Sequence, residues 1–194
     1  QAHSVPRRHL VRAPSHSALM AYLDHNATSP PLDDIVARMT EWMRTHTGNP
    51  ASLHGDGVKA RQLVDLARVQ VATLVGAKPS EVIFTSGATE ANVTAIGHLA
   101  AAEGHVVAVA TEHPAVLAPL EALGRATQLV PVDPQGQVDI PTLERALQGA
   151  SGLVLMGANN ETGVLHDLDA VAEVVQRAGI PWHCDAVQLA RWAP

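Results

Sequence analysis

The strongest constraint on the fold of this chain is an alternation of short apolar runs with amphipathic helical segments. The runs predicted to be strands are EVIFTSG (81–87), HVVAVA (105–110), QLVPVD (128–133), GLVLMGA (152–158) and PWHCD (181–185). Apolar residues at helical spacing mark residues 33–44, 58–76, 88–104, 115–126, 140–148 and 168–179. Because the apolar runs are continuous, each strand is expected to be covered on both faces. The pattern predicts an α/β fold with a mainly parallel, doubly wound sheet flanked by helices.

The composition argues against two classes of function, nucleic-acid binding and membrane spanning. The net charge is −6, and the first 19 residues contain three arginines and no acid. The rest of the chain therefore carries 10 basic against 19 acidic side chains, which argues against a nucleic-acid partner. No apolar run approaches the roughly 18 residues that would span a membrane. Cys184 is the single cysteine, which is typical of a reducing, cytoplasmic setting.

The N-terminal segment, QAHSVPRRHLVRAPSHSAL, differs from the rest. It has no clean hydrophobic period and is rich in Pro, Ser, His and Arg. We expect residues 1–19 to be a disordered extension and the folded body to occupy residues 20–194, beginning at Met20. A basic, acid-free transit peptide is the alternative for this segment.

Four polar clusters follow the predicted strands. TSGATEAN, TEHPAV, ANNETG and DAVQ each lie where an apolar run ends. Ligands of doubly wound sheets bind beyond the carboxyl ends of the strands, so these clusters are expected to converge on one edge.

Each cluster has a plain structural interpretation beside a functional one. Ser86 to Thr89 could hold an anion at a helix N-terminus, or one of their hydroxyls could simply cap that helix. His113 could stack on a flat ring or move protons. Asn159 could donate to a ligand or form a turn. Asp185 needs a partner, because a buried unpaired carboxylate is costly. An anion site, an imidazole, amide donors and a buried carboxylate together fit pyridoxal phosphate.

The motifs YLDHNATSP, GNPASLHGDG, VIFTSGATEAN, TEHPAV, ANNETGV and HCDAVQ resemble, in order and spacing, those of cysteine desulfurases. These enzymes form part of the class V aminotransferase group of fold-type-I pyridoxal-phosphate enzymes. The resemblance runs from Tyr22 to Gln188 and implies the large domain of a pyridoxal-phosphate-dependent transferase. It covers the N-terminal half of the family pattern only, so this chain would hold an incomplete domain.

The resemblance implies roles at the phosphate and the ring. Ala88 and Thr89 would bind the cofactor phosphate. His113 would stack on the pyridine ring and assist proton transfer.

It further implies that Asp185 pairs with the pyridine nitrogen and that Gln188 donates a hydrogen bond to the phenolic oxygen. Asn159 would lie near that oxygen and the substrate.

The activity implied is sulfur mobilisation from L-cysteine, giving L-alanine and a protein-bound persulfide. The implied partners are a sulfur-acceptor protein and a second copy of the chain in a homodimer, in the context of iron–sulfur cluster assembly. The family's Schiff-base lysine lies in a Ser-x-His-Lys stretch that this sequence does not contain. Its lysines, Lys59 and Lys78, match neither that stretch nor its position. The family's nucleophilic cysteine is also missing, since Cys184 lies within a predicted strand, so we expect the chain alone to be inactive.

Three alternatives stay open. The chain could be a truncated, non-catalytic remnant, a fragment that binds a partner, or part of a selenocysteine lyase-like enzyme. A metal site is not expected, because His183 and Asp185 form a pair without a third ligand. His25 stands where the family commonly has asparagine.

Overall fold

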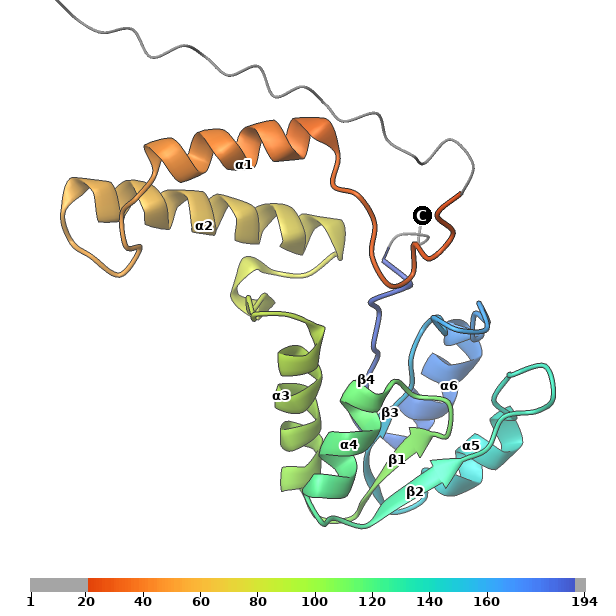
Figure 1. The fold of residues 1–194 in the computed structure, drawn as a ribbon. Helices are drawn as coiled ribbons and strands as arrows, with labels where there is room; N and C mark the ends of the chain where they lie inside the picture. The colour runs from red at the N-terminus through yellow and green to blue at the C-terminus, as the bar shows by residue number, and fades with distance from the viewer. Residues whose placement is uncertain (1–20, 191–194) are drawn as a thin grey trace, which may run out of the picture. The chain divides into compact units, whose positions relative to one another are not determined.

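The computed structural model describes residues 21–190, in which a parallel sheet of four strands organises the chain (Figure 1). The strands are β1 (His105–Val109), β2 (Thr127–Val130), β3 (Ala150–Val154) and β4 (Trp182–His183). Their order across the sheet is β2-β1-β3-β4, and every neighbouring pair is parallel. In chain order, the α-helices are α1 (Asp33–Thr45), α2 (Gly55–Leu74), α3 (Ala88–Ala101), α4 (Pro114–Ala122), α5 (Ile140–Ala146) and α6 (Leu168–Ala178), with a 3-10 turn at Pro79–Glu81.

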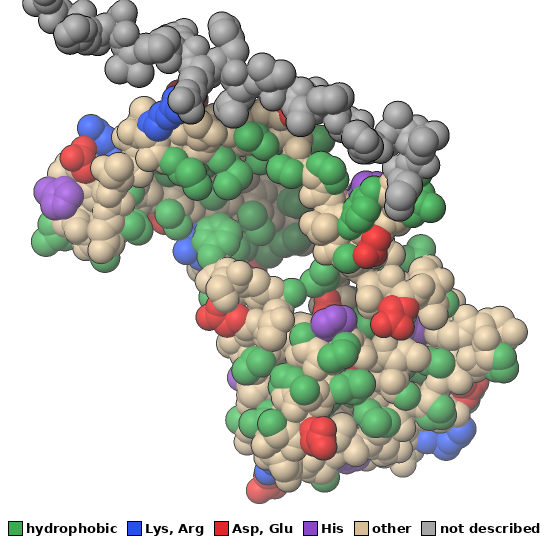
Figure 2. All heavy atoms as spheres, viewed as in Figure 1, with side chains coloured by type: hydrophobic (Ala, Val, Ile, Leu, Met, Phe, Trp, Pro, Cys, Tyr) green, Lys and Arg blue, Asp and Glu red, His purple; other side chains and the backbone are tan. Residues whose placement is uncertain are grey.

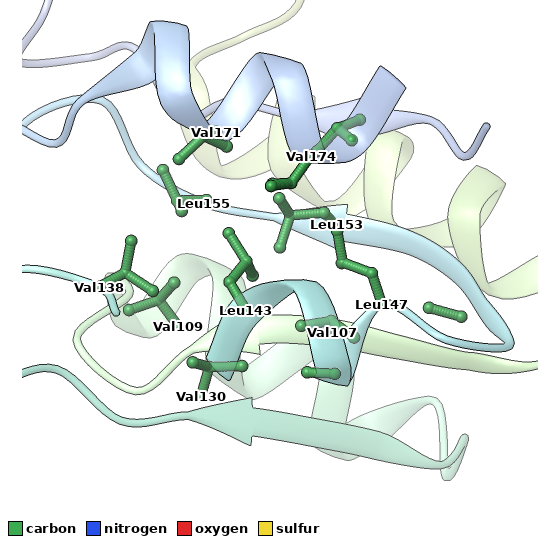
Figure 3. Close-up of a cluster of buried hydrophobic side chains, with 13 residues drawn as sticks. Val107, Val109, Val130, Val138, Leu143, Leu147, Leu153, Leu155, Val171 and Val174 are labelled. Atoms are coloured by element: carbon green, nitrogen blue, oxygen red, sulfur yellow. The ribbon is translucent and has the colours of Figure 1, made fainter. Parts of the chain in front are cut away.

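The sheet is covered on both faces, as the continuous apolar runs predict. Val107 and Val109 of β1 point into one core, which they share with α5 and α6. Val106 and Ala108 point into the other core, which they share with α3 and α4. Figure 3 shows the first core, where Leu153 lies among side chains of both neighbouring helices. The doubly wound, parallel architecture is therefore confirmed.

Polar N-caps begin the two helices that pack on the first core, α5 and α6. The Asp139 carboxylate accepts the Thr142 N–H at 2.9 Å at the start of α5, and the Asp167 carboxylate accepts the Ala170 N–H at 3.1 Å at the start of α6. Gly179 ends α6 with φ at 66°, a left-handed conformation that glycine adopts without a steric penalty.

The prediction of a strand at residues 81–87 is wrong. Val82 to Thr85 form an irregular segment, and Ile83 is 77% exposed. The Arg68 side chain donates to the Val82 carbonyl, and its guanidinium lies 5.0 Å from the centre of the Phe84 ring. An apolar, β-branched run becomes a strand only where a neighbouring strand supplies hydrogen bonds, and no strand within residues 21–190 pairs with this one.

Two units partition the chain, residues 1–30 and residues 31–194. In the described part of the first unit, the Tyr22 hydroxyl donates to the Asp24 carbonyl at 2.8 Å, and its ring meets the His25 ring edge to face. The predicted extension at residues 1–19 and the predicted start at Met20 both lie outside the described residues.

Helix α1 keeps its apolar side chains at the surface. None of the described residues of α1 is buried, and Met43 is 72% exposed. Trp42 and Met43 line an open groove of about 380 Å³ together with Leu63 and Val64 of α2. Figure 2 shows hydrophobic side chains gathered on this pair of helices. No helix in the described part of the chain is both long enough and apolar enough to cross a membrane.

Because the two cores bury β3, a cavity made in this strand should lower the stability of the fold. Replacing Leu153 by alanine should lower the free energy of unfolding by about 2–5 kcal/mol, because the side chain is fully buried. The matched change Leu129→Ala on the edge strand β2 removes a side chain that is 52% exposed, and should cost about 0.5 kcal/mol or less. Urea titrations of both variants measure the difference, and equal losses would contradict the burial described for β3.

Candidate functional site

Polar side chains from three strands meet at the carboxyl edge of the sheet. The buried Met156 N–H, just after β3, donates to the Glu112 carboxylate after β1 at 2.8 Å. The Gly157 N–H donates to the Asp185 carbonyl after β4 at 3.0 Å. The Asn159 amide donates to the Thr111 carbonyl at 3.2 Å. The convergence predicted for TEHPAV, ANNETG and DAVQ is therefore present.

Asp185 is half-buried, and two donors orient its carboxylate. Oδ1 accepts the Val187 N–H at 3.0 Å, and Oδ2 accepts the Asn92 side-chain amide at 2.9 Å. The partner that the sequence requires for Asp185 thus comes partly from α3, which is distant in sequence.

Asn92 and His183 are the site residues that the sequence analysis missed. Asn92 is 3% exposed, and its Oδ1 lies 2.8 Å from His183 Nε2. Burial lowers the pKa of His183, and the nearby Asp185 charge partly offsets that effect. The signal was the position of Asn92 one turn before Ile96, on the apolar face of α3, where a polar side chain needs a buried partner. His183 had been considered only as a metal ligand, and the described residues contain no group of three side chains that could hold a metal ion.

The N-terminus of α3 lies beside this network, because Asn92 is in the second turn of that helix. Ala88 and Thr89 in its first turn are exposed, and in the described structure no side chain caps the helix at Gly87. The Ser86 N–H and hydroxyl instead donate to the Glu90 carboxylate, both at 2.6 Å, and these bonds lower the pKa of Glu90. The simple capping interpretation is therefore wrong for this helix, because no described side chain caps it, and the first N–H groups of such a helix are suited to bind an anion.

The other predicted site residues, His113, Asn159 and Gln188, lie in a helix cap and in turns that follow the strands. His113 is exposed and caps α4, with its Nδ1 accepting the Ala115 N–H at 3.0 Å. Asn159 Oδ1 accepts the N–H groups of Glu161 and Thr162, both at 2.9 Å, so this residue does form a turn. Gln188 is half-buried in the turn that follows β4.

Glu112 is a buried carboxyl group beside this network. It is 4% exposed, and its Oε2 has no hydrogen-bond partner within the described residues. Burial, together with the negative charge of Asp185, raises the pKa of Glu112 to about 7, although the Met156 N–H opposes the shift. A substantial fraction of the Glu112 carboxyl groups therefore carries a proton near neutral pH.

Cys184 does not have the character of a nucleophile. It is half-buried, and burial raises the pKa of its thiol to about 11, with further contributions from Glu112 and Asp185. The reactive form of cysteine is the thiolate, which is scarce at neutral pH in such surroundings.

A family model described as aminotransferase class V matches residues 21–194. The chain belongs to this family. Cysteine desulfurase 2 of Trichormus variabilis is 40% identical over 180 residues, which cover 89% of this chain and 45% of that protein. The solved structure of a NifS-like protein matches with a TM-score of 0.80 and 32% identity. This match covers 84% of this chain and 48% of the NifS-like chain. A structure of SspA in complex with cysteine matches with a TM-score of 0.79 and 29% identity. This match covers 85% of this chain and 50% of the SspA chain.

The chain spans about half the length of the relatives it matches. Pyridoxal phosphate is the cofactor of this family. The residues present fit that group on chemical grounds: an oriented carboxylate suits a protonated ring nitrogen, and the uncapped start of α3 suits a phosphate.

The buried Glu112 predicts a pH-dependent stability. Its pKa is about 7 in the folded protein against 4.5 ordinarily, so the stability linked to its proton is full below about pH 4.5 and is lost as the pH rises through 7. Relative to Glu112→Gln, the wild-type free energy of unfolding should fall by about 3 kcal/mol across this window. Urea titrations at a series of pH values measure it.

Glu121→Gln on the exposed surface of α4 is the matched control, and its difference from wild type should stay constant with pH. A constant difference for Glu112→Gln as well would contradict the burial of that carboxyl group.

Proposed function

We propose that this chain supplies the cofactor-binding part of a pyridoxal-phosphate-dependent cysteine desulfurase. Such an enzyme takes sulfur from L-cysteine, leaving L-alanine and a persulfide on a protein cysteine. The observation that carries the proposal is the Asp185 carboxylate, fixed by Asn92 and Val187 at the end of β4 beside the uncapped start of α3. The desulfurase relatives and the cysteine-bound structural neighbour support the choice of substrate.

In this proposal Asp185 holds a proton on the pyridine nitrogen. The bound cofactor supplies an electron sink for the substrate carbanion, and a protonated ring makes that sink effective. Asp185 can do this because, within residues 21–190, the donors to its carboxylate are a neutral amide and a backbone N–H, which orient it but do not compensate its charge. The pKa of the second carboxyl group nearby, Glu112, is raised to about 7, so it carries less negative charge near neutral pH and competes less for the ring proton.

The phosphate is assigned to the first turn of α3, through the backbone N–H groups of the exposed residues Ala88 and Thr89 and through the Thr89 hydroxyl. His113 is assigned to the ring face and to proton transfer. Its Nδ1 accepts a backbone N–H, so in the neutral ring the proton is on Nε2, which is the nitrogen left to exchange protons.

Asn159 and Gln188 are assigned to the phenolic oxygen of the cofactor. The Asn159 amide already bonds within its own loop, which fixes its position at the end of β3. Residues 20–194 are then the N-terminal part of the family's major domain. A cytoplasmic homodimer that passes sulfur to an acceptor protein for iron–sulfur cluster assembly completes the proposal.

The roles of the lysine and the nucleophilic cysteine cannot be assigned to side chains of this sequence. Lys59 pairs with Asp56 on the exposed surface of α2, and Lys78 precedes the 3-10 turn. Cys184 has a raised pKa.

Asp185→Asn in the complete, cofactor-loaded protein should preserve the fold and cripple turnover. The amide is nearly the same size as the carboxyl group, but it cannot stabilise a ring proton by charge, so removal of the substrate α-proton should slow by orders of magnitude. Alanine production from cysteine measures turnover, and the visible absorption of the bound cofactor measures loading.

Asp167→Asn, which changes the carboxylate that caps the start of α6, is the matched control and should keep normal turnover. Near-normal turnover in Asp185→Asn, with loss in Thr89→Val or His113→Ala, would show that the assignment of Asp185 is wrong.

The 194-residue chain produced alone should release no sulfide or persulfide from cysteine. The strand-end cluster, meaning Asn92, Glu112, Asn159 and Asp185, contains no lysine, and the pKa of the neighbouring Cys184 is raised. Sulfide assays with and without added pyridoxal phosphate test this expectation. Cofactor-dependent release that survives repurification would contradict it.

A further inference from the structure

Three side chains form a hydrogen-bonded row at the edge of the sheet. His183 Nε2 lies 2.8 Å from Asn92 Oδ1, and Asn92 Nδ2 lies 2.9 Å from Asp185 Oδ2. Asn92 comes from α3, whereas His183 and Asp185 come from β4 and its end, more than 90 residues later. The amide at the centre is 3% exposed, so water cannot replace either of its partners.

The chemistry of the three groups fixes the direction of both bonds. An ionised carboxylate only accepts hydrogen bonds, so the NH₂ group of Asn92 faces Asp185. The Asn92 carbonyl oxygen then faces His183, so His183 Nε2 must carry a hydrogen and donate it. Because burial lowers the pKa of His183, the ring is neutral at physiological pH, with its single proton on Nε2.

We propose that Asn92 is a positioning residue for Asp185. It orients the carboxylate through a neutral relay from His183 and ties the carboxylate to the helix assigned to the cofactor phosphate. The inference deepens the proposed function and rests on it for its catalytic consequence. Asn92 does not touch the substrate or the cofactor; it acts through Asp185.

The relay explains why an amide suits this position. A leucine of similar size would leave both the His183 N–H and Asp185 Oδ2 without partners in a buried place. An aspartate would still accept from His183, but it would set a second carboxylate against Asp185 and draw a positive charge onto the imidazole. A neutral amide donates to one neighbour and accepts from the other, so Asp185 keeps its full charge for the ring nitrogen.

The relay also couples two contacts of the cofactor. The phosphate is assigned to the first turn of α3, and Asn92 lies in the second turn of the same helix. Through Asn92, any displacement of α3 along its axis is transmitted to the Asp185 carboxylate. The first turn of α3 and the Asp185 carboxylate would therefore be held in register with each other by one amide.

The first experiment is long-range ¹H–¹⁵N NMR of the histidine rings in the complete apoprotein, with His183 assigned by His183→Gln. Wild-type His183 should be neutral, with its proton on Nε2. Asn92→Asp should raise the pKa of His183 so that the ring becomes positively charged at neutral pH. Thr94→Ala, on the exposed surface of the same helix, should leave the signals unchanged. A wild-type ring with its proton on Nδ1, or an unchanged ring in Asn92→Asp, would overturn the relay.

The second experiment measures kinetics of the loaded protein. Asn92→Leu and Asn92→Asp should lower kcat about 10- to 100-fold, the range expected for losing a hydrogen bond to a charged group, with little change in KM for cysteine. Normal kcat in both variants would overturn the positioning role. The NMR result does not require activity: if wild type fails to desulfurate cysteine but gives the expected ring signals, the proposed function fails and the relay stands.

Discussion

The carboxylate of Asp185 is the constraint on which the rest of the site depends. A half-buried negative charge at the end of a short strand must find donors, and it finds them in the Asn92 amide and the Val187 N–H. The first of these bonds joins α3 to β4, two elements at opposite ends of the described α/β region in sequence. The same charge acts on its neighbours, since it contributes to the raised pKa values of both Glu112 and Cys184. Burial is the larger cause of both shifts, and the Asp185 charge adds to it.

Much of the fold could be predicted from the sequence because its local and long-range signals agree. The helices lie within a few residues of their predicted bounds. In α6 the apolar spacing agrees with the Asp167 cap and the closing Gly179, and in α1 it agrees with the acidic residues of the first turn. Continuous apolar runs also indicated a sheet covered on both faces, and Val106 and Val107 divide between the two cores accordingly. The convergence of polar clusters followed from topology alone, because the carboxyl ends of parallel strands share one edge.

The parts that were missed depend on partners that a linear pattern does not reveal. Residues 81–87 have the composition of a strand, but strand formation requires a hydrogen-bonded neighbour, and Arg68 occupies the Val82 carbonyl instead. Asn92 and His183 gain their roles only because α3 and β4 meet, which no spacing within either segment indicates. Nothing in the TEHPAV sequence distinguishes Glu112 from an exposed glutamate. Its raised pKa arises because the folded chain buries it beside Met156, just after β3.

Helix α1 carries an amphipathic pattern whose apolar face remains at the surface, with Trp42 and Met43 along an open groove. Isolated helices of about this length are marginally stable in water, because their stability comes mainly from packing an apolar face. The backbone of α1 should accordingly open and exchange its amide hydrogens far sooner than that of β1, whose side chains are enclosed on both faces. The chain therefore combines a rigid, slowly exchanging region around the strand-end cluster with a helix whose order depends on what covers it.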